Sequence, residues 1–538
     1  MQVSNSTWPV MYALPLTYGM ASLPADASSY VECLHASMHP PPSIHPSVVP
    51  HGCILRPPKA AINRDTTMSV SSPVYLYLGV AVLACLAQNF MRTHQLHGPV
   101  GMCKDEPSDW VEVDASNNSG NETNLLSGRI RARPCEAFSE SYFEARAKFR
   151  FATRRLAESM PTVKLHTLPV MPGQDYTIDI AVIPGSGSET RGLTIHSSGC
   201  HGVEGFAGSA VQVGFLDHLT SLLENELEPN GDDLRNVLPA TTVVLVHVLN
   251  PYGMAHYRRF NENNVDLNRN ALFSEEWPEV LTRGNVAGYE DFDEALFNPR
   301  RAPNLFNAYF TVFVKAAYAI FRYGYVNMKR SLVAGTYEHS HGIFYGGNEL
   351  QASHLLLQEF LVKEGFTTNA DMLTWIDVHT GLGPSGIDTL LAHGTDKRNG
   401  TKGDGAGDYF YGSPRPVQYH FGQGGESDGM GGGDVTSGYD LSRGIMNEYY
   451  AKLFQKSSPG VHPLIVTQEF GTVPGILVAR GMILENMAYN YAREFQPYWS
   501  QFSRDAFYIR TDAWRRSILS RGLIVLRQAI ERSSSNHK

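Results

Sequence analysis

The sequence predicts an α/β fold, a three-layer α/β/α sandwich around a mixed, largely parallel sheet. Two observations predict it. Short apolar runs rich in β-branched residues alternate with longer segments of helical spacing, which is the order that covers both faces of a sheet with helices. The chain also has 538 residues, of which 42% are hydrophobic and 18% are charged, so it can bury a large core.

The expected strands are short runs in which Val, Ile, Leu and Thr predominate. They cover residues 176–183, 193–197, 241–249, 373–378, 388–392 and 464–468. The expected helices have apolar residues three and four positions apart, with charged residues between them. They cover residues 136–160, 206–225, 304–330, 349–364, 483–496 and 505–533. The Gly-rich interval 403–433 is expected to be a loop.

The N-terminal part of the chain differs in composition from the rest. Residues 1–72 are rich in Pro, Ser and His, so we expect a disordered or non-domain region. Residues 73–90 contain an apolar run at 74–87, which has the length of the apolar part of a signal peptide or of a marginal membrane anchor. A polar linker is expected at 91–134, and one ordered domain at 135–533.

Composition excludes some classes of binding partner, but it does not decide the cellular location of the protein. The net charge of −9, without a dense run of Lys and Arg, gives no electrostatic case for binding nucleic acid. The chain has six cysteines and no Cys-x-x-Cys pair, so a Cys-based zinc module is not expected. The apolar run at 74–87 is compatible with entry into the secretory pathway or membrane anchoring, and a cytoplasmic location stays open.

Three predicted strands deliver ionisable residues at their carboxyl ends, which meet at one edge of a parallel sheet. His201 and Glu204 follow the first, His379 the second and Glu469 the third. Two histidines and one carboxylate are a common ligand set of hydrolytic zinc sites, which leave the fourth position to water. We therefore predict one Zn²⁺ bound by His201, Glu204 and His379.

Hydrolysis needs two further groups beside such a metal. A carboxylate must act as general base and then as acid toward the leaving group, and Glu469 is the candidate. A positive charge must stabilise the oxyanion, and Arg258, Arg259 and Arg269 form a cluster that could supply it.

The same residues resemble the motifs of the zinc metallocarboxypeptidase superfamily. The resemblance covers residues 136–530 approximately, and order and spacing agree. The matching strings are His201-Gly-Val-Glu204-Gly, Asn250-Pro-Tyr-Gly253, the Arg258-Arg259 pair, Asp266-Leu-Asn-Arg-Asn270, Asp377-Val-His379-Thr-Gly and Glu469-Phe-Gly471. Their full sequences look like a branch distinct from the digestive enzymes.

The resemblance implies a zinc-peptidase-like sandwich and a role for each matching residue. His201, Glu204 and His379 would be zinc ligands, and Glu469 the general base and acid. Asn268 and Arg269 match the pair that grips a substrate's terminal carboxylate, a task that suits a guanidinium. Arg258 or Arg259 would polarise the scissile carbonyl, Arg259 being preferred. The implied substrate is a peptide.

Three alternatives remain at this stage. Aspartoacylase and succinylglutamate desuccinylase resemble the same plan, so the substrate could be an N-acyl amino acid. A member of the family without catalysis would act as a binding protein. The third alternative is a serine hydrolase, but the sequence contains no Gly-x-Ser-x-Gly motif. His339 and His341 form a His-x-His pair, another possible metal motif, and Tyr409 and Tyr411 are positional candidates for a substrate-capping tyrosine.

Overall fold

The computed structural model describes residues 109–114, 129–187, 191–224, 234–393, 417–419 and 441–534. The chain divides into two units, Met1–Val70 and Ser71–Lys538, and every described residue belongs to the second. The predictions for residues 1–72 and 73–90 therefore lie outside the described residues. So do those for 403–433, apart from a short strand at 417–419.

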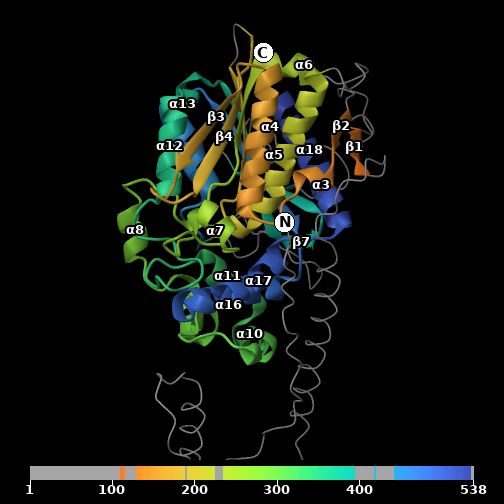
Figure 1. Ribbon diagram of the computed structural model, residues 1–538. Helices are drawn as coiled ribbons and strands as arrows, with labels where there is room; N and C mark the ends of the chain where they lie inside the picture. Colours follow the sequence, from red (N-terminus) through yellow and green to blue (C-terminus); the bar gives the residue numbers. More distant parts are fainter. Residues whose placement is uncertain are drawn as a thin grey trace, which may run out of the picture. The chain divides into compact units, whose positions relative to one another are not determined.

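An eight-stranded sheet forms the centre of the described domain (Figure 1), in the order β3-β4-β6-β5-β7-β10-β8-β9. Its strands are β3 (Lys164–Pro169), β4 (Thr177–Ile183), β5 (Gly192–Ser198), β6 (Thr241–Val246), β7 (Met372–Ser385), β8 (Asp388–His393), β9 (Val417–Tyr419) and β10 (His462–Gly471). The four central strands, β6, β5, β7 and β10, run parallel to one another. Antiparallel pairing joins β3 to β4, β4 to β6 and β8 to β10, so the sheet is mixed, as predicted.

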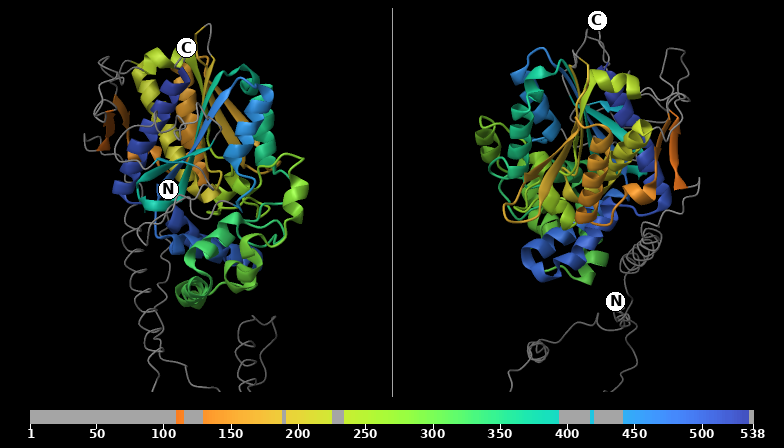
Figure 2. Two further views of the ribbon diagram at one scale, coloured as in Figure 1. Left: turned by 180° about the vertical axis from the view of Figure 1, so that it is seen from behind. Right: turned by 45° about the horizontal axis from the view of Figure 1, so that its top comes forward.

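Helices cover both faces of the sheet, which confirms the predicted three-layer sandwich (Figure 2). One face carries α4 (Tyr142–Ser159), α5 (Gly205–Leu223) and α18 (Asp512–Ser534), and the other carries α12 (Ala352–Lys363), α13 (Phe366–Asn369) and α15 (Met446–Ser457). Side chains of β6 alternate between the two resulting cores, with Val243 and Leu245 in one and Val244 and Val246 in the other. This period-two alternation is the pattern of a strand buried on both faces.

The longer of the remaining helices gather at one end of the domain, below the sheet in Figure 1. The longest are α10 (Val312–Tyr323), α11 (Tyr325–Ala334), α16 (Gly475–Tyr491) and α17 (Gln496–Phe507). Shorter helices are α3 (Pro134–Ala137), α6 (Leu234–Val237), α7 (Pro251–Ala255), α8 (Trp277–Thr282) and α9 (Tyr289–Phe292). In Figure 1, α6 lies at the opposite end of the domain and α3 lies beside the two strands at 111–114 and 129–132. None of the helices among the described residues is both long and apolar enough to cross a membrane.

The interval 91–134, predicted as a linker, is folded in the parts that the structure describes. Strands β1 (Val111–Asp114) and β2 (Arg129–Ala132) form an antiparallel pair that packs on α18 and α5. Val111 and Ile130 are buried there. The ordered domain therefore begins before residue 135, because these two short strands bury apolar side chains against its outer helices.

The segment 304–330, predicted as one helix, is divided in the structure. A π-helical turn at Asn307–Thr311 precedes α10, and Gly324 separates α10 from α11 with φ +84°. A glycine adopts this left-handed backbone without the steric cost that other residues incur, and therefore ends the helix.

Candidate metal centre

The turn after β5 places His201 and Glu204 beside each other. Gly199 takes φ +64° and reverses the chain at the end of the strand. His201 then precedes one 3₁₀ turn, Gly202–Glu204, which continues into α5. Both side chains are buried.

Gly202 allows the turn to pack closely against α7 (Pro251–Ala255). A Cβ atom at this position would lie 2.2 Å from the backbone carbonyl carbon of Gly253 in α7. The 3₁₀ turn therefore approaches α7 backbone to backbone, and only glycine permits this. Val203 N donates to Arg258 O over 2.8 Å. This hydrogen bond fixes the turn against the segment that follows α7.

The other two predicted residues come from adjacent strands of the sheet. His379 lies on β7, which pairs in parallel with β5. Glu469 lies on β10, directly opposite His379 in the parallel pairing of β10 with β7. The parallel order of β5, β7 and β10 thus brings together residues that are up to 268 positions apart in the sequence.

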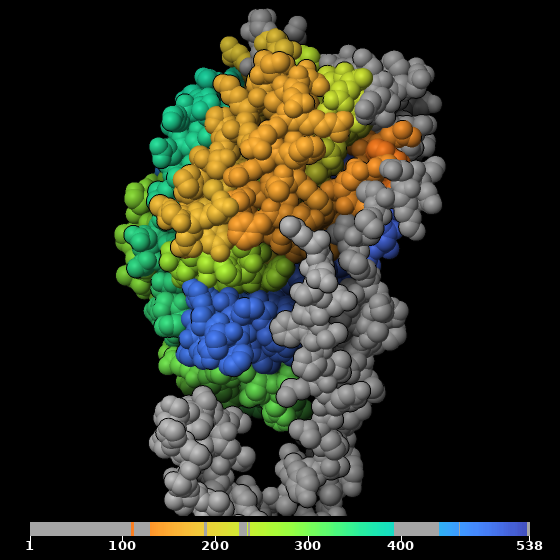
Figure 3. Space-filling model, viewed as in Figure 1, coloured from red at the N-terminus to blue at the C-terminus, as the bar shows by residue number. Residues whose placement is uncertain are grey.

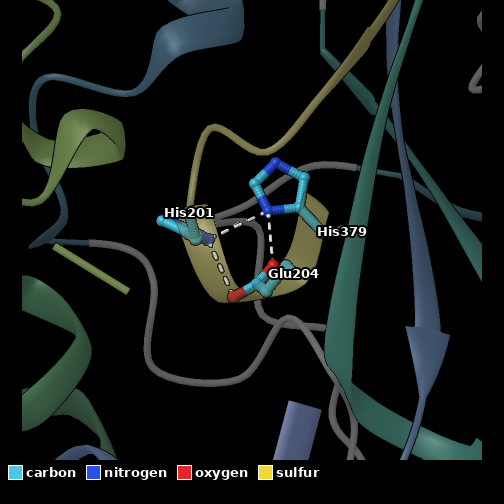
Figure 4. Close-up of side chains that lie close together, drawn as sticks. All are labelled: His201, Glu204 and His379. Carbon is cyan, nitrogen blue, oxygen red and sulfur yellow. Dashed lines mark hydrogen bonds and ion pairs between the residues drawn. The ribbon is translucent and has the colours of Figure 1, made fainter. Parts of the chain in front are cut away.

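Three potential metal-ligand atoms converge at this edge of the sheet (Figure 4). His379 Nδ1 lies 3.1 Å from His201 Nδ1 and 3.2 Å from Glu204 Oε2, and His201 Nδ1 lies 3.0 Å from Glu204 Oε1. Donor atoms bound about 2.0–2.1 Å from a tetrahedral Zn²⁺ lie about 3.3 Å apart. Both the residue types and their spacing therefore fit a zinc ion.

Each histidine has a carboxylate behind it. Asp377 Oδ2 lies 2.5 Å from His379 Nε2, and Asp266 Oδ1 lies 3.2 Å from His201 Nε2. A proton held on Nε2 by a carboxylate leaves the Nδ1 lone pair free to bind a metal, and it fixes the orientation of the ring. Both rings are therefore presented as metal ligands through Nδ1.

Further polar contacts hold Asp377 in place. Ser197 Oγ donates to Asp377 Oδ1 over 2.7 Å, and Trp375 Nε1 donates to Ser197 Oγ over 2.7 Å. All of these side chains are buried. The contacts of Ser197 and Asp266 with the site are visible only in the folded structure. The position of Asp377 follows from the sequence, because period-two alternation puts it on the same face of β7 as His379.

Arg259 connects Glu204 with the carboxylate behind His201. Its Nη1 lies 3.1 Å from Glu204 Oε1, and its Nε donates to Asp266 Oδ2 over 2.9 Å. Burial opposes the charged form of Glu204, but His201 and His379 outweigh burial and lower its pKa. Glu204 therefore stays an anionic ligand.

Arg258 does not reach this site, although the sequence left it as an alternative to Arg259. Its side chain is fully buried among other partners, where Nε lies 2.9 Å from Glu485 Oε1 in α16 and Nη2 donates to Asn264 Oδ1 over 2.6 Å. Its guanidinium also lies 3.2 Å from the ring centroid of Tyr489. The neighbouring arginines thus serve two different environments.

Glu469 is positioned by the glycine-rich segment that follows His379. Leu382 N donates to Glu469 Oε1 over 2.9 Å. Burial and the charge of Glu204 raise the pKa of Glu469 to about 7, against a smaller opposing effect of His379. A carboxyl group with a pKa near neutrality can both accept and return a proton.

Asn268 and Arg269 belong to a single 3₁₀ turn, Leu267–Arg269. Arg269 is buried, and its Nε donates to Val333 O over 2.8 Å. Asn268 Oδ1 accepts from Met446 N over 2.9 Å. The ring of Phe344 lies 4.4 Å from the guanidinium of Arg259 and 5.5 Å from that of Arg269. Phe344 has φ +59°, an unfavourable backbone for a bulky residue, and was not singled out from the sequence.

One cavity of about 360 Å³ joins these residues. His201, Glu204, His379, Glu469, Arg259, Asn268 and Arg269 all line it, and Arg258 does not. The rest of its wall is mostly apolar and comes from α10, α11 and α16. These residues include Phe313, Ile320, Met328, Leu332, Ile476 and Met482. The cavity thus combines a polar, metal-competent end with an apolar end.

His339 and His341 lie outside the candidate metal centre. His339 Nδ1 lies 3.3 Å from Asp293 Oδ2, and the ring of His341 stacks on Tyr491 with centroids 6.4 Å apart. Neither histidine lines the cavity. Tyr409 and Tyr411 lie outside the described residues.

Several solved structures are similar to this chain at low sequence identity. They include thrombin activatable fibrinolysis inhibitor (11% identity, 70% of this chain and 75% of that chain, TM-score 0.36). Two others are a metallo-carboxypeptidase from Burkholderia cenocepacia (14%, 77% and 80%, TM-score 0.33) and a protein assigned to the succinylglutamate desuccinylase/aspartoacylase family from Shewanella amazonensis SB2B (15%, 61% and 72%, TM-score 0.25). With TM-scores below 0.5, these likenesses do not bear on function.

Sequence comparison identifies a family without assigning an activity. No curated protein sequence matches the chain. Residues 138–521 match the family described as "Protein of unknown function (DUF2817)". This segment covers most of the chain and contains β3–β10 and the whole candidate metal centre. The chain therefore belongs to the DUF2817 family.

Proposed function

We propose that the protein is a zinc-dependent hydrolase of amide bonds, acting as a carboxypeptidase-like peptidase. One observation carries the proposal: the three converging ligand atoms of His201, Glu204 and His379 share a cavity with Glu469, Arg259 and Arg269. Nucleophile activation, proton transfer and carboxylate recognition each need one of these groups. Their presence in one cavity favours an enzyme over a protein that only binds.

The site's residues divide the work of hydrolysis. A zinc ion held by the three ligands would lower the pKa of a water molecule to about 7 and so supply a nucleophile at neutral pH. Glu469 accepts the proton of the attacking water and delivers it to the leaving nitrogen. Arg259 places a positive charge where the carbonyl oxygen becomes an anion.

Arg269 is the residue proposed to bind the terminal carboxylate of the substrate. It lines the cavity, and its contact with Val333 O orients the guanidinium without neutralising its charge. Asn268 lies beside it in the same turn. A guanidinium with a fixed orientation loses little side-chain entropy when a carboxylate binds.

Hydrolysis of N-acyl amino acids is the second candidate, and the apolar wall of the cavity favours it. Phe313, Ile320 and Met482 belong to this wall, which would accommodate an acyl chain as readily as an apolar side chain. Such a substrate would still present a free carboxylate to Arg269.

A substrate screen separates the two activities. The zinc-loaded protein is assayed with peptides that have free or amidated C-termini and with N-acyl amino acids, and Glu469→Gln serves as the matched control. The wild type should cleave one class, and chelation should abolish that activity. Glu469→Gln should bind zinc normally but lose at least about a hundredfold in rate, because its amide cannot accept the proton. A purified protein without stoichiometric zinc, or equal cleavage by Glu469→Gln, would contradict the proposal.

A further inference from the structure

The α10–α11 region exposes an unusual concentration of apolar side chains. More than half of the exposed large hydrophobic side chains among the described residues lie between positions 305 and 326. They are Leu305, Phe306, Val314, Tyr318, Ile320, Phe321, Tyr323, Tyr325 and Val326. We call these nine residues the apolar patch. A concentration of exposed apolar side chains of this kind marks an interaction site.

Helix α10 shows that this exposure follows the helical period. Its buried residues are Val312, Ala316 and Ala319. Val314, Tyr318 and Phe321 follow the same intervals of three and four on the outward side, and Phe321 is 88% exposed. An ordinary surface helix has polar residues there. In the space-filling view (Figure 3), the green residues of this region form the lower end of the described domain.

The sequence interval that contains the apolar patch carries charges of one sign, although Arg300 at its start pairs with Asp293. Between Glu294 and Glu338 the sequence contains no Asp or Glu. It contains six basic residues, which are Arg300, Arg301, Lys315, Arg322, Lys329 and Arg330. This segregation stands out because the chain as a whole has a net charge of −9. Exposed aromatic side chains on a helix flanked by Lys and Arg are typical of a segment that lies in the interface of an anionic membrane.

The apolar patch is continuous with the wall of the cavity. Ile320 of α10 and Tyr325 of α11 line the cavity and are also part of the patch. Ala317, another lining residue, is exposed between Val314 and Phe321 on the same helix. The apolar end of the cavity therefore lies directly beneath this surface.

From these features we infer that the α10–α11 surface binds an anionic lipid bilayer, with the aromatic side chains in the headgroup region and the basic residues on lipid phosphates. Apolar contact and charge complementarity together suit this occupant. Access of a membrane-borne substrate to the cavity would be a consequence that rests on the proposed function. Binding itself does not.

Vesicle sedimentation with the full-length protein tests this inference. Vesicles of phosphatidylcholine alone are compared with vesicles that also contain phosphatidylserine, at low and high salt. We expect binding to the anionic vesicles that weakens with salt. The double substitution Tyr318→Ser/Phe321→Ser should weaken it about tenfold or more, and Arg301→Glu/Arg322→Glu should remove the preference for phosphatidylserine.

Phe151→Ser on α4 is the matched control, since Phe151 is 67% exposed at a distant surface. It should bind vesicles as the wild type does, and circular dichroism should show that all variants are folded. Equal binding of Tyr318→Ser/Phe321→Ser and Phe151→Ser would overturn the inference, because the vesicles would then contact another part of the chain, such as 74–87. A change from dimer to monomer in the double variant without loss of vesicle binding would instead assign the surface to a second copy. The assay reads no hydrolysis, so its outcome is independent of the proposed function.

Discussion

Asp377 and His379 lie two residues apart on β7, and Asp377 Oδ2 is 2.5 Å from His379 Nε2. This contact directs Nδ1 of the ring toward His201 and Glu204. Asp377→Asn should lower zinc affinity about 10- to 100-fold, because the amide is a weaker partner for Nε2–H and the ring becomes less basic. Competition with a chromogenic chelator measures it.

Asp175→Asn is the control for this prediction, since Asp175 is exposed and pairs with Arg146 on α4. Unchanged zinc affinity in Asp377→Asn would mean that the carboxylate only supports the fold. A loss of equal size in both variants would have the same meaning.

Substitution of the two adjacent arginines should affect two different properties, stability for Arg258 and catalysis for Arg259. Arg258→Met leaves the buried carboxylate of Glu485 without its ion-pair partner, so it should reduce the free energy of unfolding by about 3–5 kcal/mol. Arg259→Met should instead reduce kcat, since its guanidinium lines the cavity and contacts Glu204. Urea denaturation and steady-state kinetics on both variants check this. Equal effects of both substitutions on kcat would show that the structure separates their roles wrongly.

This separation shows where sequence reasoning reaches its limit. The motif identifies a pair of arginines, but the direction of each side chain depends on contacts that form in the folded chain, with Glu485 for Arg258 and with Asp266 for Arg259. The partner of His201 was hidden for the same reason. Asp266 reads as the cap of a turn, and it does accept a hydrogen bond from Asn268 N over 2.9 Å. Only the folded chain shows its second contact with His201.

The fold was more accessible to prediction than the contacts within it. The central strands are recognisable in the sequence as apolar runs rich in β-branched residues, and the predicted metal ligands follow at their carboxyl ends. Edge strand β3 was missed because its residues are exposed or half-buried and include His166 and Pro169, so neither composition nor alternation distinguishes it from a loop. The break at Gly324 was missed because one glycine inside an apolar helical pattern is often tolerated.

Removal of the Arg269 guanidinium should affect substrates selectively. Arg269→Ala should raise KM about tenfold or more for substrates with a free C-terminal carboxylate, because a charge-assisted contact is lost. Amidated substrates should change little. Steady-state kinetics with matched free and amidated peptides measure the difference. Equal damage to both substrates would mean that Arg269, which bonds to Val333 O, acts through the local fold.

Asp217 on α5 should make the stability of the domain depend on pH. Burial and nearby Glu136 raise its pKa to about 6, although Arg155 and Lys148 partly oppose them. The folded state therefore retains a proton that the unfolded state releases between about pH 4 and pH 6. The free energy of unfolding therefore falls as pH rises through that window. Above it, the folded state bears the full cost of burying the charged carboxylate.

Asp217→Asn removes the cost of burying that charge. The variant should be more stable than the wild type by about 1–3 kcal/mol at pH 7.5, and the two should converge near pH 4, where the aspartate is protonated in both states. Chemical denaturation at the two pH values measures the difference. Glu158→Gln, on an exposed position of α4, should show no comparable gain. A less stable Asp217→Asn at pH 7.5 would mean that the carboxylate makes a favourable ionic contact that outweighs its desolvation.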